Sequence, residues 1–522
     1  MIGVYIFLRR KNMKKITLKT LALTLVFILC FSVVACGGRN NGNGNGNGNG
    51  NGNGGNNSYS DVKLSTEVYG GDVIYVGNTA ATTGGGASIG VPFNLGIEAA
   101  FAAYNAKGGF NGKTVALKHY DDQGDSAQAV TLMNKLIKED NVFAIVGNYG
   151  TYAVASNINI LKQNCVPMVY AAAGNNVLFN SNAQTDADRC IFPVQPLNQA
   201  EGQMLILRAF APTHKGEITE ENYVGGLGAT KVGVISNSDE ASQAMVAGIK
   251  AEAEKSGLSN ISYQNVTTSD FSAAASALQA NGCDVIIITV VGDAFVSALT
   301  ALANVNYNKA VLTSYNNANA AVFNDNESNM TEVGLSILSK MTIYAQAWID
   351  VSDDPVSGYY FTDTSSSLYK AYKRLGKIAK DENGNEIGVP GFTEEYWNIA
   401  LNIFNYAVSQ GRTDGLPMSY NSYALAGYIA GDLFCQALEE MEAQGKELTR
   451  ANLVDILESK KFKVAMADLI SYQNGAREGV QSFALTMFYD TATVTGDNNH
   501  TAASMTIHPL TSMDDYRALI GK

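Results

Sequence analysis

The sequence predicts an α/β protein made of two lobes, each a doubly wound parallel sheet with helices on both faces. The chain has 522 residues, of which 46% are hydrophobic, so it is long and apolar enough for two or three domains. Strand-like and helix-like segments alternate from about residue 72 to 171, and again from about 231 to 313. Such alternation is typical of parallel sheets whose crossover helices cover both faces.

The first run begins with an apolar strand at 72–78 and a glycine-rich turn at 84–90. After the turn, apolar residues fall at helical spacing from Phe93 to Tyr104, and a Gly-Gly pair ends the helix. The later elements expected in this run are a strand at 114–120, a helix at 126–138, a strand at 142–147, a helix at 153–161 and a strand at 167–171.

The second run repeats the pattern. Strands are expected at 231–236, 261–266, 284–291 and 310–313, with helices at 241–254, 271–280 and 294–303. Farther along, Thr393 is expected to cap a helix with Trp397 on its apolar face, and another helix is expected at about 423–443. An Asn-Gly dipeptide within 380–388 predicts a turn on an insertion.

The N-terminal segment resembles a lipoprotein export signal. Six basic residues and no acid precede an apolar run, 21–35, which is too short to be a comfortable membrane span. The run ends in Val-Val-Ala before Cys36, whose thiol is expected to take a diacylglyceryl group. The alternative is an ordinary cleaved signal followed by an incidental cysteine. Residues 1–35 are thus predicted to be the signal peptide.

A low-complexity segment follows the lipidated cysteine. Residues 37–57 are only Gly and Asn apart from Arg39, so they cannot bury apolar surface. We therefore expect 36–68 to be a tether that holds the protein at the extracytoplasmic face of the cell membrane. A lipid anchor with such a spacer favours a Gram-positive surface.

Charge argues against nucleic acid as a partner. The formal net charge is −12, and without the basic signal the chain keeps 30 Lys and Arg against 48 Asp and Glu. Affinity for nucleic acid depends on basic side chains that neutralise phosphates. A body this acidic is a poor phosphate binder.

No motif recommends catalysis, a metal or a cofactor. The Gly-Lys-Thr at 112–114 lacks the earlier glycine of a phosphate loop and precedes a strand instead of a helix. The glycines at 84–86 fit a loop whose amides approach a small ligand better than a dinucleotide fingerprint. Asp121 and Asp122 could bind a cation, but two acids at a strand end are more typical of a solvated turn. The four histidines lack metal-ligand spacing.

Four cysteines remain outside the N-terminal segment, and no two of them form a Cys-x-x-Cys pair. A zinc site or a redox motif of that type is therefore not expected. Spacing does not decide whether any two form a disulfide. The four are Cys165, Cys190, Cys283 and Cys435.

Residues 88–148 resemble the first lobe of the type I substrate-binding proteins of ABC transporters, especially those for branched-chain amino acids. The matching motifs are YNAKGGFNGKTV, YDDQGDSAQAV and AIVGN. The similarity continues more weakly to about Phe323. The stretch 363–417 finds no counterpart, so we expect it to be an insertion.

The resemblance implies two lobes joined by a three-segment hinge, with the ligand enclosed between them. The chain would then cross between lobes near Val194, Ile343 and Tyr472. The expected lobe 1 is 69–194 plus 343–472, and the expected lobe 2 is 195–342 plus 473–522.

The resemblance also implies ligand contacts. Thr151 would offer its hydroxyl and N–H to a ligand carboxylate, and the carbonyl of Ala172 would receive a ligand amine. Gly174 stands where a second Thr is usual, so only its backbone amide could serve. The other residues expected at this site are Ile89, Tyr149, Gly150, Val291 and Tyr315.

Tyr315 departs from the pattern, because amino-acid binders carry an acid there to pair with the ligand ammonium. Burying an ammonium without a counter-charge costs several kcal/mol. Either Asp239, Glu240 or Asp293 replaces that acid, or the ligand lacks the charge. For Tyr315 and Tyr149, packing in the core or at the rim is the alternative role.

The predicted function is a lipid-anchored extracytoplasmic solute-binding protein of an ABC importer. It would capture a small amino-acid-like or carboxylate ligand between two closing lobes and deliver it to an ABC permease with separate ATPase subunits. The prediction includes no cofactor and a monomeric state. The alternative is a ligand-sensing receptor of the same fold that acts on a signalling partner. An extracellular enzyme is the third hypothesis.

Overall fold

The computed structural model describes residues 59, 61–219, 222–325, 329–350, 360–374, 376, 378–381, 383–390, 392–495 and 500–522. The predicted signal peptide, 1–35, and the lipidation site Cys36 lie outside the described residues. Of the predicted tether, residues 59 and 61–68 are described, and there Leu64 is buried with its N–H donating to Asp186 Oδ2 at 3.1 Å. The expectation of a free tether is therefore wrong for this part, which is held against the folded body.

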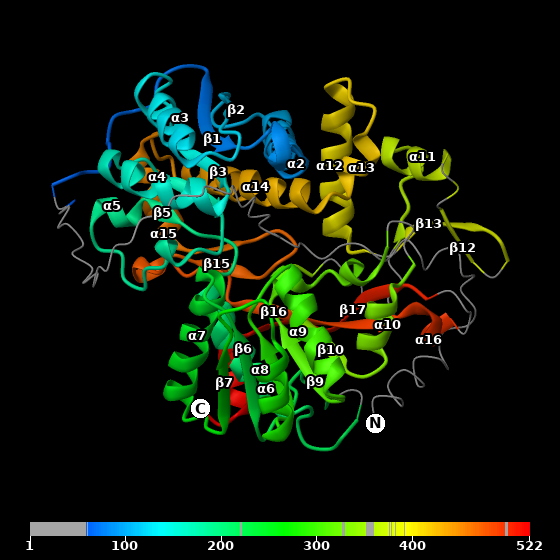
Figure 1. The fold of residues 1–522 in the computed structure, drawn as a ribbon. Coiled ribbons are helices and arrows are strands. Elements are labelled where there is room, and N and C mark those ends of the chain that lie inside the picture. Colours follow the sequence, from blue (N-terminus) through cyan, green and yellow to red (C-terminus); the bar gives the residue numbers. More distant parts are fainter. Residues whose placement is uncertain are drawn as a thin grey trace.

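The first lobe, called lobe 1 here, is built on a five-stranded parallel sheet (Figure 1). Its strand order is β2-β1-β3-β4-β5, with every neighbouring pair parallel. The strands are β1 (Val73–Ala80), β2 (Thr114–Asp121), β3 (Ile145–Tyr149), β4 (Met168–Ala172) and β5 (Ile191–Phe192).

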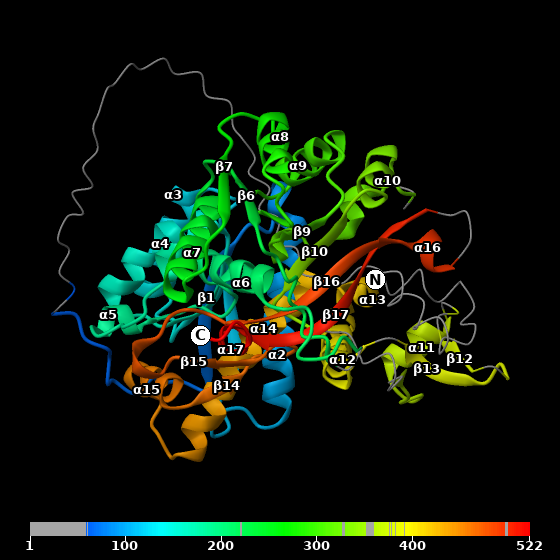
Figure 2. The same cartoon turned by 90° about the horizontal axis from the view of Figure 1, so that it is seen from below.

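Helices lie on both faces of this sheet. Helix α2 (Ala87–Ala106) packs along α14 (Ser422–Ala443) on one face, and α3 (Ser126–Lys138) packs against α4 (Thr151–Asn164) on the other. The glycine-rich turn forms the short helix η2 (Gly84–Gly86) directly before α2. Because α14 comes from far along the sequence, lobe 1 is assembled from separate segments (Figure 2).

The second lobe, lobe 2, has a seven-stranded sheet with the order β17-β16-β10-β9-β8-β6-β7. Five strands are parallel: β6 (Val232–Ser236), β7 (Ile261–Asn265), β8 (Val285–Ile288), β9 (Ala310–Thr313) and β10 (Thr342–Ala347). The other two, β16 (Ser482–Asp490) and β17 (Ala502–Ser512), pair antiparallel at one edge. The prediction of a purely parallel sheet is therefore corrected for this edge.

Strand β8 shows how the second sheet is covered. Its side chains alternate between faces, so Val285 and Ile287 join the cluster under α6 (Asn198–Phe210) and α7 (Glu240–Ser256). Ile286 and Ile288 join the cluster on the opposite face. The helices on that face are α8 (Ser272–Ala280), α9 (Asp293–Asn304) and α10 (Glu332–Leu338).

Three chain crossings join the two sheets. The first runs from β5 to α6 and the third from β15 (Leu469–Ser471) to β16; they lie side by side, since the N–H of Val480 donates to the carbonyl of Val194 at 2.8 Å. The second leaves lobe 2 after β10, which pairs with β9 and β16 over its length. That crossing therefore begins after Ala347, a few residues later than the position expected near Ile343.

The predicted insertion folds as an extra layer beside lobe 1 (Figure 1). It has a small sheet of order β11-β13-β12, and α12 (Glu394–Ser409) begins at Thr393, whose side chain accepts from the N–H of Tyr396 as the sequence predicts. Trp397 lies in an aromatic cluster with Phe361 and Tyr372. The other elements are β11 (Tyr360–Phe361), α11 (Ser367–Arg374), β12 (Ala379–Lys380), β13 (Glu386–Pro390) and α13 (Gly415–Ser419).

Short elements complete the described chain, and the helices and strands predicted in the two runs are confirmed with shifts of a few residues at their ends. No helix among the described residues is long and apolar enough to cross a bilayer. The remaining α-helices and strands among the described residues are α5 (Asp186–Arg189), α15 (Arg450–Ser459), β14 (Lys461–Lys463), α16 (Thr491–Thr495) and α17 (Met513–Leu519).

Candidate functional site

The predicted site residues of lobe 1 gather where its strands end. In a parallel sheet the carboxyl ends of the strands share one edge, which is where such folds bind ligands. Strand β3 ends at Tyr149, and Gly150 then turns the chain with φ = 98° so that α4 begins at Thr151. A side chain at Gly150 would adopt a disfavoured backbone and place its Cβ 2.6 Å from the ring of Tyr152. Thr151 is half-buried in the first turn.

Tyr149 packs at the side of this edge. Its ring centroid lies 5.7 Å from that of Phe93 on α2. Burial is the main cause that raises the pKa of Tyr149, so the hydroxyl stays protonated at neutral pH. Tyr149 is half-buried, as a rim residue would be.

Asp122 is fully buried, so the prediction of a solvated turn is wrong for this residue. Its Oδ1 accepts from the hydroxyl of Tyr152 at 2.7 Å and from the N–H of Gly124 at 3.0 Å. Burial raises the pKa of Asp122 above its ordinary value. The neighbouring Asp121 accepts from the N–H of Thr82 at 2.9 Å, which fastens the turn before α2 to the end of β2.

Buried side-chain amides next to the same edge are held by hydrogen bonds. Asn78 Nδ2 donates to Asn94 Oδ1 at 2.8 Å, and the Asn78 Oδ1 lies 3.1 Å from His119 Nδ1. The hydroxyl of Thr79 donates to Asn148 Oδ1 at 3.0 Å. Burial lowers the pKa of His119, which therefore acts here as a neutral hydrogen-bonding group.

Gly174 and Tyr315 come together at the first crossing. The N–H of Asn198 donates to the carbonyl of Gly174 at 3.0 Å, and the hydroxyl of Tyr315 donates to the carbonyl of Pro196 at 3.1 Å. A Cβ at Gly174 would lie 3.1 Å from the Tyr315 hydroxyl, so the glycine makes room for it. Tyr315 is 1% exposed, which fits the alternative role of packing in the core.

Glu201 is a residue of this region that sequence reasoning missed. It lies buried on α6, where Oε1 accepts from the N–H of Tyr315 at 2.7 Å and Oε2 accepts from the hydroxyl of Ser314 at 2.9 Å. Burial raises its pKa to about 8. The only sequence signal is one acid within an apolar helix. Asp239 and Asp293, which we considered as partners for a ligand ammonium, are exposed instead.

We expect the buried carboxyl of Glu201 to make stability depend on pH. Because its pKa is about 8 in the folded chain and about 4.5 when unfolded, the folded chain holds this proton more tightly, and the free energy of unfolding falls as pH rises from about 4.5 to 8. The slope is at most about 1.4 kcal/mol per pH unit. Urea titrations at pH 5, 6.5 and 8 should show this fall in the wild type relative to Glu201→Gln. The exposed control Asp239→Asn keeps Glu201 and should follow the wild-type curve. Parallel pH curves for the wild type and Glu201→Gln, or a control that loses the fall as Glu201→Gln does, would contradict the assignment.

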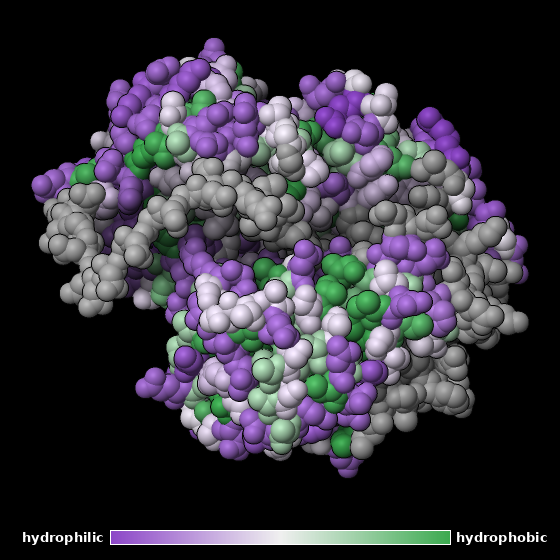
Figure 3. Space-filling model, in the orientation of Figure 1, coloured by the Kyte–Doolittle hydropathy of each residue, from purple (hydrophilic) through white to green (hydrophobic). Residues whose placement is uncertain are grey.

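The remaining predicted residues lie near the strand ends of the two sheets, and no specific contact joins them to one another. Ile89 is half-buried in the first turn of α2, and Ala172 is buried at the end of β4. Val291, half-buried, follows β8 and precedes Gly292, whose φ of 64° opens α9. The surface is hollowed between the two lobes on the face shown in Figure 3.

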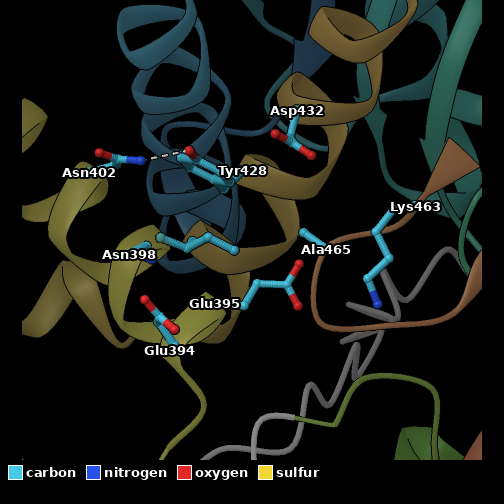
Figure 4. Close-up of a pocket in the computed structure, with 9 residues that line it drawn as sticks. Glu394, Glu395, Asn398, Asn402, Tyr428, Asp432, Lys463 and Ala465 are labelled. Carbon is cyan, nitrogen blue, oxygen red and sulfur yellow. Dashed lines mark hydrogen bonds between the residues drawn. The ribbon is translucent and has the colours of Figure 1, made fainter. Parts of the chain in front are cut away.

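A separate hollow lies where the insertion meets lobe 1 (Figure 4). Its volume is about 510 Å³, and it is lined by α12, α14, the end of β14 and the segment that follows β14. The carboxylates of Glu394, Glu395 and Asp432 face it together with the ammonium of Lys463. Burial, aided by nearby acids, raises the pKa of Asp432 to about 6. None of the eight ligand contacts predicted from the sequence lines this hollow.

Comparison with known proteins identifies the family. The model of a family described as periplasmic binding protein matches residues 73–361, which is more than half of the chain. The chain belongs to this family. The resemblance noted in the sequence is thereby confirmed, as is the α/β fold of two lobes. Members of this family are extracytoplasmic binding proteins and not enzymes.

Curated relatives cover part of the chain. Leu/Ile/Val-binding protein homolog 2 of Brucella abortus is 26% identical over 215 residues, which is 41% of this chain and 53% of the relative. The amino acid binding protein of Pseudomonas aeruginosa is 25% identical over 224 residues, which is 41% of this chain and 52% of that protein. The chain thus spans about half the length of the curated relatives it matches.

Solved structures of periplasmic binding proteins share the fold. An extracellular ligand-binding receptor from Verminephrobacter eiseniae has a TM-score of 0.54 at 16% identity, covering 81% of this chain and 99% of that one. A solute binding protein of an ABC transporter from Rhodopseudomonas palustris, in complex with p-hydroxybenzoic acid, has a TM-score of 0.51 at 15% identity, covering 84% and 98%. These likenesses concern the fold alone.

Proposed function

We propose that this periplasmic binding protein is the solute-binding component of an ABC importer and encloses its ligand between the two lobes. The observation that carries the proposal is the pair of doubly wound sheets joined by three crossings, with strand ends that bear Tyr149, Thr151 and Val291. Closure exchanges the hydration of the open lobes for ligand contacts from both sides, and the crossings absorb the movement. The lobes that we propose are 69–194 with 348–472, and 195–347 with 473–522.

The proposal places the protein at a membrane through Cys36 and gives it a permease with ATPase subunits as partners. The signal-like segment and the Gly/Asn spacer support the anchor. The ligand that we propose is a small carboxylate or an amino-acid-like solute. The names of the curated relatives support this class, and so does the solved neighbour that holds an aromatic acid.

The local geometry also favours a carboxylate. The first N–H groups of α4 lack helical partners, and Thr151 adds a hydroxyl in the same turn. These donors at the start of α4 can hold an anion without a basic side chain. Tyr315, with its hydroxyl bound to Pro196, adds no charge that would pair with a ligand ammonium.

A thermal-shift screen of the mature chain tests the proposal. A ligand that binds only the folded protein stabilises it by about 2.7 kcal/mol when the ligand concentration is 100 times its Kd. We expect a rise in Tm with branched-chain amino acids or with aromatic acids such as 4-hydroxybenzoate. A screen in which no amino acid or small carboxylate raises Tm would overturn the proposed ligand class.

Thr151→Ala should then weaken the binding of the ligand found. Loss of a hydrogen bond to a charged group costs roughly 1.5 to 3 kcal/mol, so we expect about a 10- to 150-fold rise in Kd measured by calorimetry. The matched control is Thr131→Ala, which changes an exposed threonine on α3. Equal affinities for the two variants would place the ligand away from the start of α4.

A further inference from the structure

Two of the four cysteines in the described chain lie on neighbouring segments of lobe 1. Cys165 follows α4 with φ = 42°, and Cys190 follows α5 directly before β5. The N–H of Met168 donates to the carbonyl of Cys190 at 2.8 Å, which joins the backbones beside the two residues. Each side chain is at most 1% exposed.

Both are free thiols in the structure, buried in the same hydrophobic cluster just before the paired strands β4 and β5. The Cys190 thiol donates to the carbonyl of Asp186 at 3.2 Å, which holds the sulfur in one place. Cys283 and Cys435 are different, because each is buried in its own surroundings without another cysteine acting on it. The fold therefore selects one pair out of the six pairings that four cysteines allow.

We propose that Cys165 and Cys190 form a redox site that closes a disulfide when the exported chain folds. This rests on the extracytoplasmic placement of the family, since disulfides persist in oxidising compartments and are reduced in the cytosol. It does not depend on which ligand binds.

The chemistry is thiol–disulfide exchange with a donor disulfide, either an oxidised protein dithiol or a small-molecule disulfide. One cysteine thiolate attacks a donor sulfur, forms a mixed disulfide and releases one donor thiolate. The second cysteine loses its proton and attacks its neighbour's sulfur, which releases the other donor thiolate. The two thiolates take up the two protons, so the donor is reduced to two thiols while the pair is oxidised.

The two thiols differ once lobe 1 has folded. The neighbouring Cys190 side chain lowers the pKa of Cys165, whereas burial raises the pKa of Cys190. Because both sulfurs are buried, the exchange takes place while lobe 1 is still folding. The product would tie the end of α4, which begins at Thr151, to the strand that leads into the first crossing.

Trypsin gives a direct test, since it cuts between the two cysteines. Cleavage after Lys162, Arg189 and Arg208 places Cys165 on peptide 163–189 and Cys190 on peptide 190–208. The full chain would be exported from a secreting host, blocked with an alkylating reagent in denaturant and digested without reductant. We expect the two peptides as one linked species that separates when reductant is added. Recovery of both peptides alkylated and unlinked, or either one linked to Cys283 or Cys435, would overturn the proposal.

Variants give a second measurement. Reduction should lower the Tm of the wild type and of the control Cys283→Ala by about 5 °C, because the bridge closes a loop of 25 residues. Cys165→Ala and Cys190→Ala should show the same Tm with and without reductant. A wild-type Tm that reductant does not change would count against a bridge.

Discussion

Gly427→Ala is expected to lower the free energy of unfolding by roughly 3 kcal/mol or more, which is a large change for one methyl group. Gly427 lies on α14 where that helix crosses α2. A Cβ added there would lie 1.8 Å from the carbonyl oxygen of Phe93, a backbone atom that cannot swing aside. The same crossing is tight from the other side, since a Cβ at Gly96 would lie 1.9 Å from the carbonyl oxygen of Ala424.

The sign of this effect is informative, because helix propensity works in the opposite direction. Alanine in place of glycine stabilises an isolated helix by about 1 kcal/mol. The expected loss therefore comes from separating two backbones that touch, and urea unfolding would measure it. Glu439→Ala, at an exposed position of the same helix, should change stability by less than about 0.5 kcal/mol. If Gly427→Ala were as stable as the wild type, α2 and α14 could move apart without a loss in the free energy of unfolding.

The alternation of strands and helices could be predicted because each element carries its own periodicity. Strand β8 is a continuous apolar run and α3 shows a spaced apolar face, so both were found without tertiary information. The strands β16 and β17 were missed. They pair antiparallel after a long return of the chain from lobe 1, and nothing local to either segment shows which partner it will find.

The candidate site was harder to predict, because burial is decided by elements far apart in the sequence. Asp122 looks like half of a solvated acidic pair, yet Tyr152 from α4 covers it. Tyr315 was placed at the ligand through the family resemblance, whereas the fold turns its hydroxyl to Pro196. Glu201 gains its role only once α6 lies under the end of β9.

Arg477→Ala is expected to destabilise the protein by roughly 3 to 5 kcal/mol, the range for removing one partner of a buried ion pair. Arg477 is buried on the third crossing, and its guanidinium donates to the carboxylate of Glu458 and to the carbonyl of Arg189 at 2.9 Å. The same group lies 4.5 Å over the ring of Phe192 at the start of the first crossing. One side chain thus fastens two hinge segments to each other.

Two further variants separate charge from geometry. Arg477→Lys keeps the charge but has no planar fork, so it should lose part of the same stability. Arg412→Ala removes a half-exposed ion pair with Asp414 and should cost less than about 1 kcal/mol. If Arg477→Ala were no worse than Arg412→Ala in urea, the backbone bond between Val480 and Val194 would suffice to hold the crossings. A large loss would instead show that the hinge depends on this buried guanidinium.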